Sequence, residues 1–250
     1  MRIPLIAANW KMNKTTEETR DFIINFVPHV QNLTGVEILI APPFTSLAVA
    51  AKFLKGTGIK LGAQNLFYEK SGAYTGEISP LMIKDCGCEY VIVGHSERRQ
   101  YFNETDEIIN KKLRAAQETG LSVILCIGER LEEREKGQTF DVLKKQLSKG
   151  IEGVKASQLV IAYEPVWAIG TGKTATLEQI SEAHGFIRDM LEELLKEGAN
   201  QVRILYGGSV NADNAKDILN TKDVDGALVG GASLKPESFI KIVMAKGVKK

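Results

Sequence analysis

A glutamate stands at the end of an apolar segment, directly before a glycine-containing loop. Glu164 follows the apolar residues Leu159–Tyr163, and the next residue, Pro165, cannot continue a central strand. The loop then runs through Gly-Thr-Gly at 170–172 to Thr176, where a helical pattern starts. A carboxylate at the end of a strand can act as a general base, and the loop beside it can close as a lid. We therefore expect an enzyme that keeps water away from a charged intermediate.

The same loop contains Gly172-Lys173-Thr174, which looks like the end of a phosphate-binding P-loop. That motif requires a glycine five residues before Gly172, and Trp167 stands there instead. Because the glycine that would form the cradle is missing, we do not expect a nucleoside triphosphate site.

Two other apolar segments end in groups suited to catalysis. Lys11 follows the first segment, and His95 follows the fourth. Ser96 is a good N-cap, so a short helix starting there would direct its positive end at the imidazole and favour neutral His95 as a hydrogen-bond donor. Lys11 could attract an anionic substrate and stabilise an oxyanion. Taken alone, the lysine could equally be a solvated surface group, and the histidine could simply cap a turn.

Glycine pairs follow two further apolar segments near the end of the chain. They are Gly207-Gly208, with Ser209 next, and Gly230-Gly231. Glycines let a backbone approach a ligand closely, and exposed N–H groups there suit a phosphate. Each pair alone could make a plain turn, but two in consecutive units indicate a phosphate site.

The remaining histidines and the cysteines give no sign of a metal or redox site. His29 and His184 lie within helical patterns, and we expect packing or surface positions for both. Cys86 and Cys88 form a Cys-x-Cys pair with no second pair and no nearby histidine, so neither zinc-ligand nor redox spacing is met. We expect buried thiols and, without a disulfide framework, a cytosolic protein.

Short apolar segments alternate with longer amphipathic segments along the whole chain. The apolar segments are Ile3–Trp10, Val36–Ala41, Ile59–Gln64, Tyr90–Gly94, Ser122–Ile127, Leu159–Tyr163, Val202–Tyr206 and Gly226–Val229. They are too uniformly apolar for a half-exposed antiparallel sheet, so we expect strands covered on both faces. The amphipathic segments, which we expect to be helices, are Glu17–Val30, Ser46–Leu54, Pro80–Asp85, Thr105–Glu118, Thr139–Ile151, Thr176–Lys196, Ala212–Leu219 and Glu237–Met244. Repeated strand–helix units of about 30 residues predict an α/β protein, a single-domain (β/α)₈ barrel over residues 1–250, with a doubly wound open sheet as the alternative.

Composition excludes several classes of function. The chain is 44% hydrophobic and 25% charged with a formal net charge of +1, so no overall field favours nucleic acid or an anionic membrane. No apolar run approaches the roughly 20 residues of a membrane span. The first residues lead directly into a strand-like segment, so we expect no signal peptide.

Two polar stretches stand apart from the strand–helix pattern. The charge run Glu129–Lys136 is mixed in sign with helical spacing, and we expect a solvated helix face. The connection Asn65–Ser79 is long and contains several Gly, Tyr and Ser residues. Long connections in compact domains tend to be functional, so we expect a role for this one.

Five sequence motifs together resemble the triosephosphate isomerase family. They are Asn-Trp-Lys-Met-Asn at 9–13, Gly-His-Ser-Glu-Arg-Arg at 94–99, Ala-Tyr-Glu-Pro-Val-Trp-Ala-Ile-Gly-Thr-Gly at 162–172, Tyr-Gly-Gly-Ser-Val at 206–210 and Leu-Val-Gly-Gly-Ala-Ser at 228–233. They occur in the family's order with no large insertion, and no expected catalytic position departs from its pattern. The resemblance covers nearly the whole chain.

The resemblance implies interconversion of dihydroxyacetone phosphate and glyceraldehyde 3-phosphate. It implies that Glu164 moves a proton between neighbouring substrate carbons while neutral His95 donates to the substrate oxygens. The other implied roles are enediolate stabilisation by Asn9 and Lys11, orientation by Glu97, phosphate binding by Gly170, Ser209, Gly230 and Gly231, and coverage of the base by Ile169 and Leu228 when the lid closes. No metal or organic cofactor is implied.

The resemblance also implies a cytoplasmic homodimer that serves glycolysis and gluconeogenesis. We expect the Asn65–Ser79 loop to build much of the dimer interface, because a loop this long gains burial by docking into a partner. In the resembling family, the residue matching Thr75 reaches toward the partner's active site. We expect no nucleic-acid or membrane partner.

Two other classes of function remain open at this stage. A different phosphosugar enzyme, such as a Schiff-base aldolase, would need a lysine within the barrel, and Lys11 would have to serve. A phosphate-binding protein without activity is the other class, although it would have no use for Glu164 together with His95.

Overall fold

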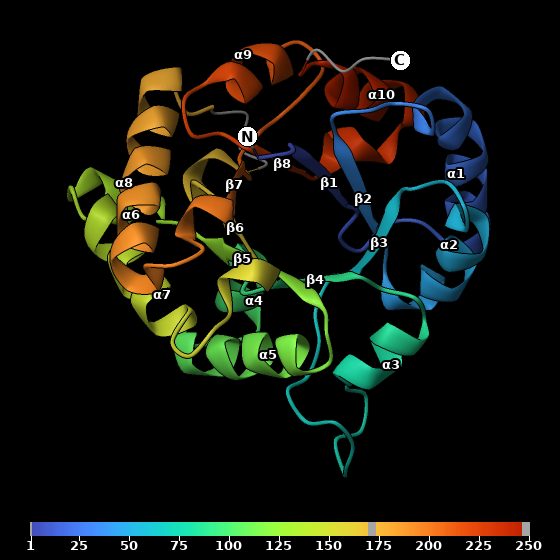
Figure 1. The fold of residues 1–250 in the computed structure, drawn as a ribbon, viewed down its shortest axis with the longest axis horizontal. Coiled ribbons are helices and arrows are strands. Elements are labelled where there is room, and N and C mark those ends of the chain that lie inside the picture. Colours follow the sequence, from blue (N-terminus) through green and yellow to red (C-terminus); the bar gives the residue numbers. More distant parts are fainter. Residues whose placement is uncertain (1, 170–173, 247–250) are drawn as a thin grey trace.

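The chain folds into a closed barrel of parallel strands surrounded by helices (Figure 1). The computed structural model describes residues 2–169 and 174–246. The strands are β1 Leu5–Asn9, β2 Glu37–Ala41, β3 Lys60–Ala63, β4 Tyr90–Val93, β5 Ser122–Ile127, β6 Leu159–Tyr163, β7 Arg203–Tyr206 and β8 Gly226–Val229. Each pairs with the next, and β8 pairs with β1 in the register Leu5↔Gly226. The predicted barrel is therefore confirmed, and the open sheet is excluded because the pairing of β1 with β8 closes the sheet and leaves no edge strand.

The outer layer consists of helices that follow the strands in turn. They are α1 Thr16–Val30, α2 Leu47–Leu54, α3 Pro80–Asp85, α4 Ser96–Tyr101, α5 Asp106–Glu118, α6 Leu131–Glu135, α7 Thr139–Gly150, α8 Leu177–Leu195, α9 Ala215–Asn220 and α10 Pro236–Met244. Their starts have local causes: Thr15 and Thr176 form capping boxes at α1 and α8, and Ser79 caps α3 before a proline at its first position.

Both faces of the strands are buried, as their uniform apolar sequences predict. One cluster of side chains fills the barrel interior and includes Leu39, Ile92, Ile124 and Leu205. Side chains that alternate with these along the strands form a larger cluster with the helices. This two-sided burial explains why the strands lack an alternating polar pattern, and it makes the barrel a rigid frame for groups at its ends.

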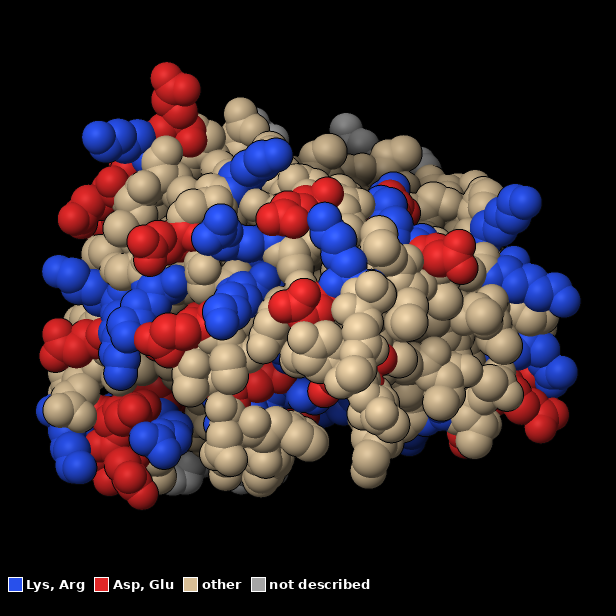
Figure 2. Space-filling model, turned by 90° about the horizontal axis from the view of Figure 1, so that it is seen from below, with Lys and Arg blue, Asp and Glu red and all other residues tan. Residues whose placement is uncertain are grey.

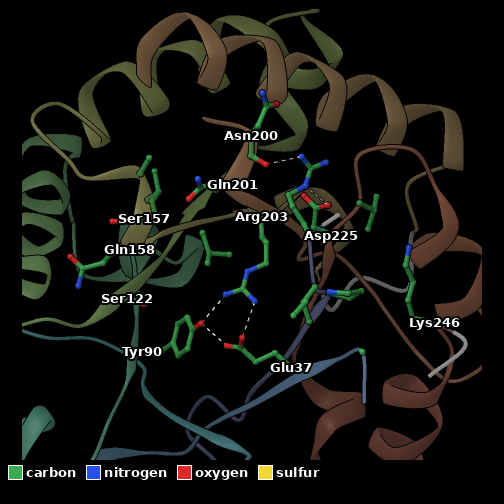
Figure 3. A pocket seen from close by; sticks show the side chains of 18 residues that line it. Glu37, Tyr90, Ser122, Ser157, Gln158, Asn200, Gln201, Arg203, Asp225 and Lys246 are labelled. Atoms are coloured by element: carbon green, nitrogen blue, oxygen red, sulfur yellow. Dashed lines mark hydrogen bonds and ion pairs between the residues drawn. The ribbon is translucent and has the colours of Figure 1, made fainter. Parts of the chain in front are cut away.

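A cavity of about 850 Å³ lies at the amino-terminal end of the strands. Its centre is a charged network in which Arg203, Tyr90 and Glu37 point toward one another (Figure 3). Tyr90 donates to Glu37 at 2.5 Å, and Arg203 donates to Glu37 at 3.2 Å and to the Tyr90 hydroxyl at 2.8 Å. Burial raises the pKa of Tyr90 to about 12, so this hydroxyl stays protonated and donates. The three side chains satisfy one another's hydrogen-bonding groups. In this fold, residues at the amino-terminal end of the barrel contribute to stability, and the active site lies at the opposite end.

Replacing Arg203 with methionine should lower the free energy of unfolding by about 1–3 kcal/mol, because Glu37 and Tyr90 lose a charged donor in a partly buried place. Urea unfolding at fixed protein concentration measures this change. Arg20→Met is the control, because Arg20 pairs with Asp21 on the open surface and such pairs contribute little. Equal losses in the two variants would show that the network does not stabilise the barrel.

His184 and the cysteines lie in packed positions, as expected. His184 is fully buried with Nδ1 3.0 Å from the carbonyl of Asp223, and burial lowers the pKa of His184 to about 4. His184 therefore packs as a neutral ring. Cys88 and Cys126 are buried free thiols, and Cys86 is partly buried. No helix within residues 2–169 and 174–246 is both long and apolar enough to cross a membrane.

Candidate active site

Glu164 follows β6 and is buried at the carboxyl end of the barrel. Its carboxylate accepts the backbone N–H of Ser96 at 3.0 Å through Oε2, and Oε1 lies 3.0 Å from Nε2 of His95. Burial raises the pKa of Glu164, but these two partners more than offset burial and the pKa lies below its ordinary value. Glycine is required beside it, since a Cβ on Gly207 would lie 2.9 Å from Cγ of Glu164. The carboxylate is therefore ionised and held in a fitted space.

His95 follows β4 and is itself the N-cap of α4, whereas the expected cap, Ser96, is the first residue of the helix. Its Nδ1 accepts the backbone N–H of Glu97 at 3.3 Å, which leaves Nε2 to carry the proton toward Glu164. Burial lowers the pKa of His95, but the adjacent Glu164 carboxylate outweighs burial and raises the pKa above its ordinary value. The Nδ1 hydrogen bond fits the neutral tautomer, whereas the Glu164 contact favours the cation. That His95 is neutral during catalysis therefore stays a prediction. It concerns the state in which Glu164 has moved away from His95.

Lys11 lies beyond the end of β1, where contacts through its ammonium and its backbone N–H hold it. Its ammonium is 2.7 Å from Oε1 of Glu97, and its backbone N–H donates to Oδ1 of Asn9 at 3.1 Å. Its backbone also has a positive φ of 52°, which is unfavourable for a residue with a Cβ. Asn9, Lys11 and Glu97 thus form one connected group that continues to His95 through the Glu97 backbone.

A cavity of about 310 Å³ brings most of the expected site residues together. Its lining includes the base, the histidine, the lysine and the predicted phosphate-binding residues: Asn9, Lys11, His95, Glu164, Ile169, Gly207, Gly208, Ser209, Leu228, Gly230 and Gly231. Glu97 contacts Lys11 and His95 from outside this lining. Gly170 and the rest of the expected lid, 170–173, lie outside the described residues. A pocket that holds a carboxylate, an imidazole and an ammonium together can move a proton on a small anion.

Glu129 corrects the sequence-based interpretation of the charge run. It is fully buried, not solvated, while α6 in the same run has no buried residue. Its carboxylate accepts the Tyr163 hydroxyl at 3.1 Å, Trp167 Nε1 at 2.9 Å and Arg134 Nη1 at 3.1 Å. These donors compensate the buried charge and tie β6 to the front of the loop that follows Glu164. In the sequence, only Tyr163 and Trp167 could have indicated a buried carboxylate here, because aromatic donors that pack inside a protein require acceptors.

These observations define the class of protein. It is a (β/α)₈-barrel enzyme whose base, proton donor and cation surround one small cavity at the carboxyl ends of β6, β4 and β1. The sequence model of triosephosphate isomerase matches residues 4–246, and the chain belongs to this family.

Relatives and a solved structure support the same family. The triosephosphate isomerase of Geotalea uraniireducens is 56% identical over 247 residues, which cover 97% of this chain and 98% of the relative. That of Aquifex aeolicus is 56% identical over 241 residues, covering 96% and 98%. A crystal structure of triosephosphate isomerase from Bartonella henselae superimposes with a TM-score of 0.90 at 40% identity, covering 97% of this chain and 98% of that one. The resemblance found in the sequence is confirmed.

Proposed function

We propose that this chain interconverts dihydroxyacetone phosphate and D-glyceraldehyde 3-phosphate in glycolysis and gluconeogenesis, as one domain over residues 1–250. The observation that supports it best is the ionised, buried Glu164 beside His95 and in one cavity with Lys11. Family membership supplies the substrate class.

In the proposed mechanism, Glu164 takes a proton from one substrate carbon and returns it to the neighbouring carbon. Its carboxylate must first leave the Ser96 N–H and His95, because both of its oxygens are engaged there. Nε2–H of His95 is then free to donate to the substrate oxygens, where negative charge develops. Lys11 and Asn9 stabilise the enediolate, and Glu97 orients the lysine ammonium.

Other residues of the cavity lining form the proposed phosphate site. Ser209, Gly230 and Gly231 line it, and we propose that Gly170, which lies outside the described residues, also binds the phosphate. Ile169 and Leu228 also line the cavity, and we propose that they cover Glu164 when the loop closes.

A coupled isomerase assay in the presence of EDTA tests the proposed activity. We expect turnover to persist, because every step uses side chains of this chain. Absence of isomerisation, or its loss with EDTA, would contradict the proposal. A Schiff-base lysine attacks as a free amine, whereas Lys11 is held in an ion pair with Glu97. Borohydride with substrate should therefore leave the activity intact.

Replacing His95 with glutamine should lower kcat by about 10²–10⁴-fold, with a smaller effect on substrate affinity. The donor matters most where oxyanion charge develops, and substrate binding retains Lys11 and the glycine backbones. Steady-state kinetics separate the two parameters. Nitrogen NMR of the wild-type ring with a bound substrate analogue should show neutral imidazole at neutral pH, and an imidazolium there would contradict the assigned role.

We further propose a cytoplasmic homodimer joined through the Asn65–Ser79 loop. This loop extends away from the barrel between β3 and α3 (Figure 1). Within it, Phe67 stacks on Tyr68 with ring centroids 4.3 Å apart. Figure 2 shows the face to which it belongs, with charged side chains interrupted by a broad uncharged area. Exposed apolar side chains lie in the loop, in α3 and at the end of α4: Tyr74, Leu81, Met82, Tyr101 and Phe102. Docking against a second copy would bury them, and Thr75 would approach the partner's Lys11 region.

A further inference from the structure

Gln64 joins the ends of three neighbouring strands through one side-chain amide. It directly follows β3, and its Nε2 donates to the carbonyl of Ala41 at 2.8 Å and to the carbonyl of Lys11 at 2.9 Å. Ala41 ends β2, and Lys11 lies just beyond β1. Both partners are carbonyl oxygens, so only the NH₂ group of the amide fits between them.

The Lys11 backbone needs such support. Its φ of 52° lies in the left-handed region, where a Cβ makes the conformation unfavourable, and such residues persist only when their surroundings hold them. The N–H of Lys11 is held by Asn9 from the same strand. The Gln64 amide holds the carbonyl on the other side of the same residue, from a neighbouring strand.

This backbone conformation sets where the lysine side chain lies. Lys11 lines the cavity, and a Cβ on Gly230 would lie 3.5 Å from Cε of Lys11, so the stem runs past the proposed phosphate backbone. The Glu97 carboxylate attracts the ammonium from the other direction. If the backbone relaxed, the ion pair with Glu97 would persist while the stem moved away from Gly230.

We propose that Gln64 is a positioning residue for Lys11. It holds the Lys11 carbonyl, and through it the left-handed backbone, so that the ammonium faces the substrate phosphate and enediolate. This inference rests on the proposed isomerase function, and it adds a residue that neither the motifs nor the cavity lining identifies.

Gln64→Met tests the proposal, because it keeps the length of the side chain and removes both donors. We expect kcat/KM to fall roughly 10- to 100-fold, as a displaced catalytic group causes, and inhibition by inorganic phosphate to weaken. Gln117→Met is the matched control. Gln117 is buried, and its side-chain amide likewise bonds backbone groups, the N–H and the carbonyl of Lys155, each at 2.8 Å, but it lies on α5 away from the cavity. The Gln117→Met variant should have a lower melting temperature, with unchanged kcat/KM and unchanged inhibition by inorganic phosphate.

A double-mutant cycle with Lys11→Arg distinguishes positioning from general destabilisation. If Gln64 acts through Lys11, Gln64→Met should reduce kcat/KM much less in the Lys11→Arg background than in the wild type. Full additivity, or a Gln64→Met enzyme with wild-type kinetics, would overturn the proposal. Should Gln64→Met not fold, Gln64→Asn supplies the same test, because the shorter amide cannot reach both carbonyls.

A crystal structure of the folded variant gives a readout that does not depend on activity. We expect the Lys11 backbone to leave the left-handed region, and an unchanged positive φ would overturn the positioning role. A wild-type enzyme without isomerase activity would instead contradict the proposed function, whatever the Lys11 backbone does.

Discussion

Replacing Glu164 with glutamine is expected to lower kcat by about 10²–10⁴-fold, the usual effect of losing a general base. The amide keeps the shape of the side chain, so it should fit the space bounded by Gly207 and retain the Ser96 N–H contact. It cannot accept a proton from carbon. The proposed phosphate-binding residues Ser209, Gly230 and Gly231 are unchanged, so inhibition by inorganic phosphate should stay close to that of the wild type.

Glu37→Gln is the matched control for this change. Glu37 is a partly buried carboxylate at the amino-terminal end of the barrel, where it contacts Tyr90 and Arg203 but no site residue. The control should keep wild-type turnover even if it loses stability. Near-native turnover of Glu164→Gln would remove Glu164 as the base, and equal losses in the two variants would show that the effect comes from folding.

Shortening the loop at Tyr68–Tyr74 is expected to give a monomer with sharply reduced activity. Ordering each backbone residue costs roughly 1–2 kcal/mol, so a loop this long is stable only when a partner buries it. In the proposed dimer the loop lies beside the partner's Asn9 and Lys11. Dissociation would then disturb the strained Lys11 backbone while Glu164 and His95 are retained.

Sedimentation and steady-state kinetics of the same preparations measure both parts of this prediction. Tyr74→Ser and Phe140→Ser form a matched pair, because the two aromatic side chains are 44% and 42% exposed on different parts of the surface. Only Tyr74→Ser should weaken the dimer. A shortened variant that still sediments as a dimer would exclude this interface, and a fully active monomer would exclude the coupling to Lys11.

The barrel could be predicted because its signals are local. Each strand lies in a largely apolar run, and each catalytic candidate directly follows such a run, as Lys11, His95 and Glu164 do. In a closed parallel barrel the positions that follow the strands all lie at one end, so residues from separate motifs are expected to form one site.

The remaining parts of the site depend on contacts between residues far apart in the chain. The carboxylate of Glu164 meets the Ser96 N–H across 68 positions, and Trp167 meets Glu129 across 38. The charge run around Glu129 follows a helical surface pattern, and nothing in that pattern indicates that three donors converge on one member. The sequence does not indicate the role of Gln64 for the same reason, since its partners, the carbonyls of Lys11 and Ala41, lie at the ends of two other strands.

Isomerisation in deuterium oxide, followed by proton NMR, tests the central claim most directly. A proton taken up by the Glu164 carboxylate exchanges with solvent, so dihydroxyacetone phosphate should give glyceraldehyde 3-phosphate that carries deuterium at C2. The reaction should proceed in EDTA, and Glu164→Gln should suppress both isomerisation and deuterium uptake. Wild-type isomerisation with the substrate hydrogen fully retained, together with undiminished isomerisation by Glu164→Gln, would contradict the account, because a hydride that moves directly between the carbons needs no base.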